Sequence, residues 1–339
     1  MIFLNEYVIA LDVMGGDNAP AAVLEGAQAA LSEMPDIKLA LCGREEVVRP
    51  LESDRVRIVP ASEVISMEEP PMLAVRRKAD SSLVRAMLEV REGRAQAVVS
   101  AGSTGAVLAG GMFRIGRIRG IDRPALAGML PARKGPTLLL DVGANVDCQP
   151  KYLDAFAMMG SVYMESVVGI NRPRVGLANI GTEAEKGNKL AKEAYDLMSA
   201  QKGYNFCGNV EAREISSGDY QVVVFDGFDG NLILKYTEGI SRDMMGMLKE
   251  AIMSGGILGK IGGILLKPAF RAFKKRMDYS EYGGAPLLGV DGAVVKAHGS
   301  SNAKAICSAI RQARLMLEND VVGKIRAGVE DLANDNKEE

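Results

Sequence analysis

Glycine and hydroxyl residues gather in loops that directly follow predicted strands. After the apolar run at residues 97–100 come Gly102, Ser103, Thr104 and Gly105, and a helix-compatible stretch follows. At such strand-to-helix turns, free backbone N–H groups and the positive end of the helix dipole attract anions. Two hydroxyl groups add further donors, so this loop is a candidate phosphate cradle. A tight turn with a Ser or Thr helix cap is the alternative interpretation.

The same pattern recurs in three other loops, which strengthens the anion-binding interpretation. Residues 12–17, 298–302 and 226–231 all follow predicted strands, and the first two supply the candidate phosphate ligands Asp12, Gly15, Gly16, Gly299 and Ser300. None of the loops matches the Walker A pattern, and none shows a clean GxGxxG after the first strand. The pattern therefore disfavours a nucleotide triphosphatase or a dinucleotide enzyme and favours a compact anion such as phosphate.

Short β-branched runs alternate with longer amphipathic stretches along the chain, which is the spacing of βαβ units. We expect strands at residues 7–13, 37–42, 56–60, 97–100, 138–142, 174–180, 222–226 and 293–299. Residues 1–339 are therefore expected to form one α/β enzyme unit, an α/β/α sandwich around a mostly parallel sheet. Asp12 and Asp141 fall at strand ends, where a carboxylate either orients a lysine or caps a loop.

Two boundaries are expected outside this repeating pattern. Pro150 opens a helical segment after a loop, so a lobe boundary is placed near residue 150. Residues 330–339 are expected to form a flexible acidic tail.

Composition excludes several classes of protein. With 47% hydrophobic and 25% charged residues, the 339-residue chain has globular values, which argues against disorder and a polytopic membrane protein. A net charge of -2 provides no basic field for nucleic acid. Four scattered cysteines form no CxxC pair, and the N-terminus lacks a basic signal region, so a cytoplasmic location is expected. No paired ligand spacing indicates a metal, and we expect neither metal nor cofactor.

A series of sequence blocks carries a resemblance that runs nearly end to end. The blocks are ALDVMGGDNAP (10–20), AVRRK (74–78), SAGSTGA (100–106), GIDRPALA (120–127), LLDVGANVD (139–147), MGSVY (159–163), GTEAEKGN (181–188), GNVEAR (208–213), DGFDGN (226–231), YGGAPLLG (282–289) and KAHGSS (296–301). Together they resemble the phosphate acyltransferase family of bacterial phospholipid synthesis. That resemblance implies a fold similar to phosphotransacetylases and to the isocitrate and isopropylmalate dehydrogenases. Asn18 departs from the family's usual histidine and cannot shuttle a proton, although it can hydrogen-bond.

The resemblance also implies a reaction: fatty acyl-[acyl carrier protein] and inorganic phosphate give acyl phosphate and free carrier protein. Phosphate dianion is already a nucleophile, so direct attack on the thioester requires orientation and oxyanion stabilisation without a covalent enzyme intermediate. By resemblance to the family's motifs, Lys186 is expected to hold phosphate or the oxyanion, and Asn231 to donate an amide N–H. His298, the only histidine, is the third candidate catalytic residue, with a structural role as its alternative.

Three alternatives remain open at this point. A short-chain phosphotransacetylase would use a coenzyme A thioester with the same fold and mechanism. A thiol-acyl enzyme would use Cys148 as nucleophile and His298 as base. A non-catalytic scaffold would bind carrier protein or membrane without phosphate-dependent turnover.

Residues 250–280 are expected to protrude as a basic and apolar helical segment. We expect Leu258 and Ile261 at its tip to contact an anionic membrane, and nearby cations to meet the membrane or the acidic carrier protein; these are Lys267, Arg271, Lys274, Lys275 and Arg276. The alternative is a buried helix at the interface of a homodimer, an assembly expected from the related folds. Peripheral association with the inner face of the membrane would suit handover of the product to a membrane glycerol-3-phosphate acyltransferase.

Overall fold

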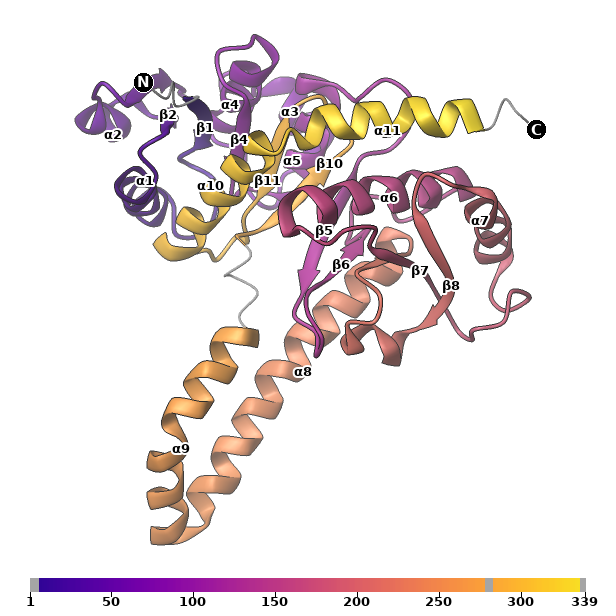
Figure 1. Cartoon of the computed structure of the whole chain (residues 1–339). Helices are drawn as coiled ribbons and strands as arrows, with labels where there is room; N and C mark the ends of the chain where they lie inside the picture. Colours follow the sequence, from indigo (N-terminus) through magenta and orange to yellow (C-terminus); the bar gives the residue numbers. More distant parts are fainter. Residues whose placement is uncertain (1–5, 278–282, 336–339) are drawn as a thin grey trace, which may run out of the picture.

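The computed structural model describes residues 6–277 and 283–335, with the backbone alone for residues 272, 274–277 and 333–335. Within this part, one 11-stranded sheet runs through the molecule (Figure 1). Its strands are β1 (Tyr7–Asp12), β2 (Ile37–Gly43), β3 (Val56–Pro60), β4 (Ala97–Ser100), β5 (Ala125–Leu130), β6 (Thr137–Leu140), β7 (Arg174–Asn179), β8 (Asn205–Glu211), β9 (Val222–Val224), β10 (Ala285–Leu288) and β11 (Ala293–Lys296). The helices are α1 (Ala21–Glu33), α2 (Glu45–Val48), α3 (Pro71–Arg77), α4 (Ser82–Arg91), α5 (Thr104–Gly110), α6 (Pro150–Tyr163), α7 (Lys189–Ala200), α8 (Gly227–Ser254), α9 (Gly256–Met277), α10 (Ala303–Glu318) and α11 (Val321–Asp335).

The sheet consists of two parallel halves that run in opposite directions. The strand order is β3-β2-β1-β4-β11-β10-β5-β6-β9-β7-β8. Pairing is parallel from β3 to β11 and again from β6 to β8, whereas β10 and β5 pair antiparallel with both of their neighbours. Three antiparallel pairings lie between β11 and β6, so the strands of the second half run opposite to those of the first half. The chain connects β1 toward β2 and β3 on one side and then places β4 on the other, which makes the gap between β1 and β4 a topological switch point.

Alternating side chains give the sheet an apolar layer on each face. On β1, Ile9 and Leu11 belong to one buried cluster and Ala10 to the other. The first cluster contains Phe156 of α6 and Ile306 of α10. The second includes buried residues of α3, α4 and α5. Helices therefore cover both faces, and the predicted mostly parallel α/β fold is confirmed.

Helices α8 and α9 form an antiparallel hairpin that projects from the body (Figure 1). The 28 residues of α8 correspond to about 40 Å of helix. The chain reverses at Gly255 and Gly256, and Gly256 has a φ of +65° that favours glycine. The predicted protrusion at 250–280 is thus the outer part of a longer hairpin, and residues 278–282 lie outside the described part. In the residues that the structure covers, no helix is long and apolar enough to cross a membrane.

The other predicted boundaries fall as follows. Residue 150 is the start of α6. The chain crosses toward the second half of the sheet before this point, at β5, and crosses back at β10. Residues 330–335 form the end of α11, and residues 336–339 lie outside the description.

Candidate active site

Asp12, Ser100 and Lys296 form a row across the carboxyl ends of three neighbouring parallel strands. Ser100 on β4 is in register with Asp12 on β1 and with Lys296 on β11. The Ser100 hydroxyl donates to Asp12 Oδ2 at 2.6 Å and accepts the Gly102 N–H at 3.0 Å. Asp12 is 2% exposed and Lys296 is 6% exposed, so the row buries a carboxyl group and an amine in one layer.

Lys296 is a buried cation with little direct compensation. Its ammonium group donates to the Ala297 carbonyl. Burial lowers the pKa of Lys296 to about 8, while the more distant charges of Asp12 and Asp17 act in the opposite direction. The residue is therefore mostly protonated at neutral pH, and an anion placed beside it would relieve the cost of burying its charge.

A cavity of about 330 Å³ opens beside Lys296, between the two halves of the sheet. Its polar lining consists of Thr104, Asn231, Lys235, Glu238, Lys296, His298 and Ser301. Thr104 follows β4, His298 follows β11, and Asn231 lies in the first turns of α8, after β9. Gly143 has a φ of +123°, and a Cβ there would lie 3.6 Å from the Asn231 Cβ, so this loop packs directly on Asn231. The cavity thus collects two cations, uncharged donors and the Glu238 carboxylate, which pairs with Lys235, from distant parts of the sequence.

His298 is arranged as a neutral hydrogen-bond donor. Its Nδ1 lies 2.8 Å from Ser300 Oγ and accepts the Ser300 backbone N–H at 3.2 Å. Burial lowers the pKa of His298, and the nearby charges of Lys235 and Lys296 lower it further. With Nδ1 acting as an acceptor, the proton of the neutral ring is assigned to Nε2. The imidazole can therefore donate a hydrogen bond from Nε2 to a carbonyl oxygen in the cavity.

The loop after β1 supports this site through its contact with residues 298–301. The Asp17 N–H donates to the Gly299 carbonyl at 2.8 Å, and Asn18 Nδ2 donates to the carbonyls of Ser300 and Ser301 at 3.1 and 3.2 Å. The expectation that Asn18 hydrogen-bonds is met. Gly15 must be glycine because a Cβ would lie 2.3 Å from Asp12 Oδ2. Gly16 lies beside it with a φ of +105° and belongs to the same support.

Asp141 fixes the corresponding loop in the second half. Its carboxylate accepts the N–H groups of Leu126, Ala144 and Asn145 at 2.9, 3.1 and 2.6 Å. Burial raises the pKa of Asp141 to about 6, and these hydrogen bonds act against the rise. Gly230 then allows α8 to touch this loop, since a Cβ there would lie 1.9 Å from the Asp141 carbonyl oxygen. The glycines of residues 226–231 therefore serve close packing at the start of a helix.

The comparison with known proteins identifies the chain. Residues 7–324 match the model of a family described as fatty acid synthesis protein. A phosphate acyltransferase from Clostridium perfringens (strain SM101 / Type A) is 49% identical over 335 residues, covering 97% of this chain and 98% of that protein. This chain belongs to the phosphate acyltransferase family. The match confirms the family that the sequence blocks had suggested, and with it an acyltransferase enzyme.

Solved structures support the fold of this phosphate acyltransferase family member. A phosphotransacetylase from Streptococcus pyogenes superposes with a TM-score of 0.61 at 16% identity, covering 92% of this chain and 94% of that one. A 4-hydroxythreonine-4-phosphate dehydrogenase from Klebsiella pneumoniae gives a TM-score of 0.50 at 16% identity, covering 91% and 98%. At these identities the likeness concerns architecture, and it agrees with the expected relation to transacetylases and dehydrogenases.

Among the predicted catalytic residues, the structure brings Asn231 and His298 to the cavity, whereas Lys186 is exposed on the loop between β7 and α7. The Lys186 carbonyl accepts from Asn179 Nδ2 at 3.0 Å. Of the predicted phosphate loop, Thr104 lines the cavity, Gly102 and Ser103 are buried, and Gly105 makes room for Pro71.

Sequence reasoning missed Lys296, which in this member of the phosphate acyltransferase family is a buried cation of the cavity. The available signal was a lysine that ends the apolar run AVVK. It also missed Lys235, which pairs with Glu238 at 2.8 Å at the cavity wall.

Cys148 has the properties of a poor nucleophile. Burial raises the pKa of its thiol to about 12, with the charges of Asp141 and Asp226 adding to the effect. Because the thiolate is the reactive species, a thiol in this environment is unreactive near neutral pH. These properties disfavour the thiol-acyl alternative.

Proposed function

We propose that this chain transfers a fatty acyl group from an acyl-carrier-protein thioester to inorganic phosphate, giving acyl phosphate and free carrier protein. Membership of the phosphate acyltransferase family supports the reaction class. The single observation that carries the proposal is the buried Lys296 beside a cavity of about 330 Å³ between the two halves of the sheet. A small dianion is the ligand that such a cation favours.

The proposed chemistry is direct displacement at the thioester carbonyl. A phosphate oxygen forms a bond to the carbonyl carbon, the carbonyl oxygen becomes an oxyanion, and the C–S bond then breaks to release the thiolate, which takes up a proton from solvent. Lys296 holds the dianion against the carbonyl, and the Thr104 hydroxyl donates to it. The Asn231 amide and His298 Nε2–H stabilise the oxyanion, an effect typically of about 10²–10³-fold for each donor.

The remaining predicted residues take supporting roles in this proposal. Lys186, which is exposed on its loop outside the cavity lining, is proposed as a further cation for the bound substrate. Asp12 positions Lys296 electrostatically and fixes the turn that contains Gly15 and Gly16. The phosphate loop is completed by backbone near Gly102, Ser103, Gly105, Gly299 and Ser300.

A phosphate-dependence assay tests the proposal. Purified protein and a long-chain acyl-[acyl carrier protein] should release carrier thiol only when phosphate is present. Equal turnover of a short-chain coenzyme A thioester would favour a phosphotransacetylase activity. Thiol release without phosphate would indicate a thioesterase, and binding without turnover would indicate a scaffold.

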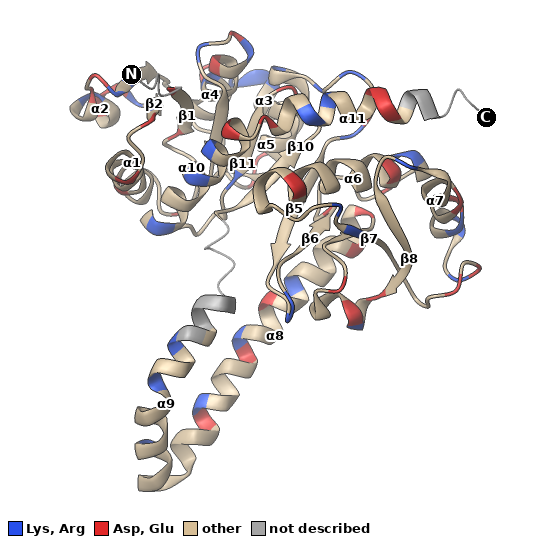
Figure 2. Cartoon of the chain, viewed as in Figure 1, with Lys and Arg blue, Asp and Glu red and all other residues tan. Residues whose placement is uncertain are grey.

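We also propose that the hairpin attaches the protein to the inner face of the membrane from a cytoplasmic location. Its tip exposes Leu258 by 82% and Leu265 by 75%, and Figure 2 shows little charge at the turn. Lys267 and Arg271 are exposed on α9. The side chains of Lys274, Lys275 and Arg276 lie outside the described part, and their place beside these cations rests on sequence. Acyl phosphate made there would pass to a membrane glycerol-3-phosphate acyltransferase.

A homodimer is the second part of the hairpin proposal. The face of α8 that points away from α9 exposes apolar side chains at helical spacing: Leu232, Tyr236, Ile240, Met244 and Met247. An apolar stripe of this length on a projecting helix is suited to packing against the same stripe of a second copy. The dimer and the membrane contact then use different parts of one hairpin.

A further inference from the structure

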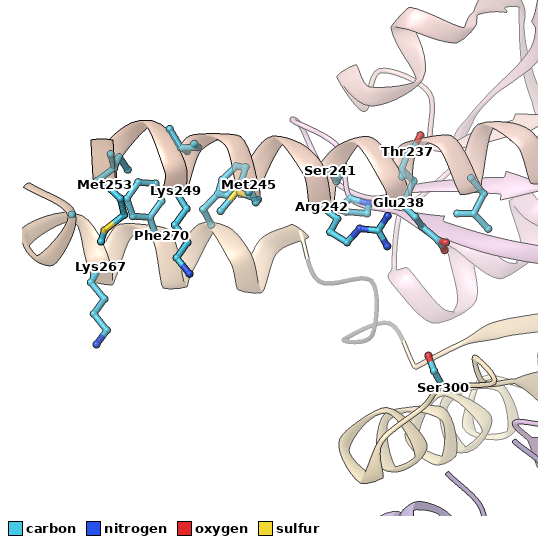
Figure 3. A pocket seen from close by; sticks show the side chains of 18 of the residues that line it. Thr237, Glu238, Ser241, Arg242, Met245, Lys249, Met253, Lys267, Phe270 and Ser300 are labelled. Atoms are coloured by element: carbon cyan, nitrogen blue, oxygen red, sulfur yellow. The ribbon is translucent and has the colours of Figure 1, made fainter. Parts of the chain in front are cut away.

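A long groove runs between α8 and α9 and reaches the body of the protein. Its volume is about 1220 Å³. The side chains along it are largely apolar and include Met245, Leu248, Ile252, Met253, Ile264 and Phe270. In Figure 3, Met245, Met253 and Phe270 occupy the space between the two helices, and Ser300 faces the inner end of the groove from the body. The groove therefore reaches the body at its inner end and is largely apolar, with charged side chains along its border.

The groove is continuous with the candidate active site. Both spaces are bounded by Met129, Leu234, Glu238 and His298. His298, the proposed oxyanion donor, thus lies where the groove meets the cavity. A substrate with its reactive group in the cavity can place an attached apolar chain in the groove without a break.

We infer that this groove binds the hydrocarbon chain of the fatty acyl substrate while the thioester carbonyl lies in the cavity. The inference rests on the proposed function. One leaflet of a bilayer, about 15 Å thick, is filled by a single acyl chain. Along α8, the distance from Leu234 to Met253 is about 28 Å. The groove is therefore long enough for a full fatty acyl chain, whose end would lie near Met245.

A second hairpin is a less suitable occupant of the groove. The exposed apolar stripe that begins at Leu232 and Tyr236 lies on the opposite side of α8, so a second copy can pack there and leave the groove open. Arg242, Lys249 and Lys267 border the groove with long aliphatic stems and exposed charged ends, which lets them cover a hydrocarbon chain. Burial in the groove favours longer acyl chains, because each buried methylene group raises the binding affinity by up to about fourfold.

The test is to block the groove part of the way along. Ser241 borders it about 10 Å beyond Leu234 along α8. Ser241→Trp should lower kcat/KM for a 16-carbon acyl-[acyl carrier protein] by at least about tenfold and change that of a 6-carbon substrate by less than about twofold. Gly239→Trp is the matched control, because Gly239 does not border the groove and a Cβ there meets nothing within 4 Å. It should leave both substrates unchanged.

Two outcomes overturn the inference while leaving the reaction itself intact. In the first, Ser241→Trp uses the 16-carbon substrate as well as wild type does. In the second, kcat/KM of Ser241→Trp falls equally for both substrates although circular dichroism shows an intact fold. The proposed function fails separately if wild-type protein shows no phosphate-dependent turnover of either substrate.

A second measurement requires no variant. A 16-carbon acyl thioester with a mid-chain diazirine should label peptides of α8 and α9 on irradiation. Labelling confined to other elements would contradict the groove as the chain site.

Discussion

Replacing Lys296 by methionine should separate phosphate binding from folding. Methionine keeps most of the length and apolar volume of the lysine side chain and removes the ammonium group. In the folded chain Lys296 is 6% exposed and lines the cavity. We therefore expect Lys296→Met to fold normally and to lose affinity for phosphate.

The expected effect on stability follows from the pKa of Lys296. The folded-state pKa is about 8 against an ordinary value of 10.5, so burial disfavours the charged form by about 3 kcal/mol. At neutral pH the charge is present in both the folded and the unfolded chain. Removing it should therefore raise the free energy of unfolding by up to about 3 kcal/mol. Asp12 loses a nearby cation in the variant, which makes the net gain smaller. At about 2 °C for each kcal/mol, Tm should stay constant or rise by a few degrees.

The expected effect on binding is a loss of one charge-assisted contact. Such a contact contributes about 1.5–3 kcal/mol, so KM for phosphate should rise by about 10- to 100-fold. In wild type, the same KM should rise about tenfold for each pH unit above 8, because Lys296 loses its proton there, and Lys296→Met should lack this dependence. Steady-state kinetics at varied phosphate, with the exposed Lys192→Met as control, measures both effects.

Two results would contradict a phosphate-binding role for Lys296. A folded Lys296→Met protein whose KM for phosphate stays within twofold of wild type removes Lys296 from the phosphate site. A loss of more than about 2 kcal/mol in the free energy of unfolding would mean that the ammonium is a structural ion-pair partner.

Three further predictions concern the other proposed residues. Lys186→Ala and Asn231→Ala should each lower kcat/KM by about 100-fold or more, and an unchanged value removes that residue from the mechanism. Light scattering should give the mass of two chains for wild type and of one chain for Tyr236→Glu; a monomeric, fully active wild type contradicts the dimer. Leu258→Glu combined with Ile261→Glu should abolish flotation with anionic liposomes and keep the dimer mass, so unchanged flotation, or loss of the dimer, speaks against the membrane contact.

Much of the sheet could be predicted because most strands are local apolar runs. The residues of β1 and the AVVK run of β11 are mostly apolar, so their types alone indicate buried strands. In contrast, β5 (ALAGML) lacks β-branched residues, and β10 (APLL) is short and contains a proline. These strands form because they pair with neighbouring strands in the sheet. Their pairing partners are distant in the sequence, so the local residues do not predict them.

The candidate site could be predicted only in part for the same reason. The sequence identifies Asn231 and His298 through their motifs, and it places Thr104 in a loop after a strand. It does not reveal that the antiparallel strands β10 and β5 reverse the strand direction in the second half of the sheet. Loops that are expected to meet at one edge of a parallel sheet therefore belong to two halves with opposite strand directions. The register that aligns Lys296 with Ser100 and Asp12 is likewise invisible before the strands are paired.

The glycines in the hairpin show how local preference can mislead. Residues 254–276 contain several interior glycines, each costing about 1 kcal/mol in a helix relative to alanine. Taken alone, this composition predicts a weak helix or a flexible tip, whereas α9 is helical from Gly256 to Met277 and packs beside α8.

In the proposed reaction, phosphate itself is the acyl acceptor. The direct measurement is to incubate long-chain acyl-[acyl carrier protein] with radiolabelled phosphate and to count labelled acyl phosphate and free carrier thiol in the same sample. We predict one labelled acyl phosphate for each thiol released, with no thiol released when phosphate is omitted. Thiol release that continues without phosphate, or that yields free fatty acid in place of labelled acyl phosphate, would contradict direct acyl transfer to phosphate.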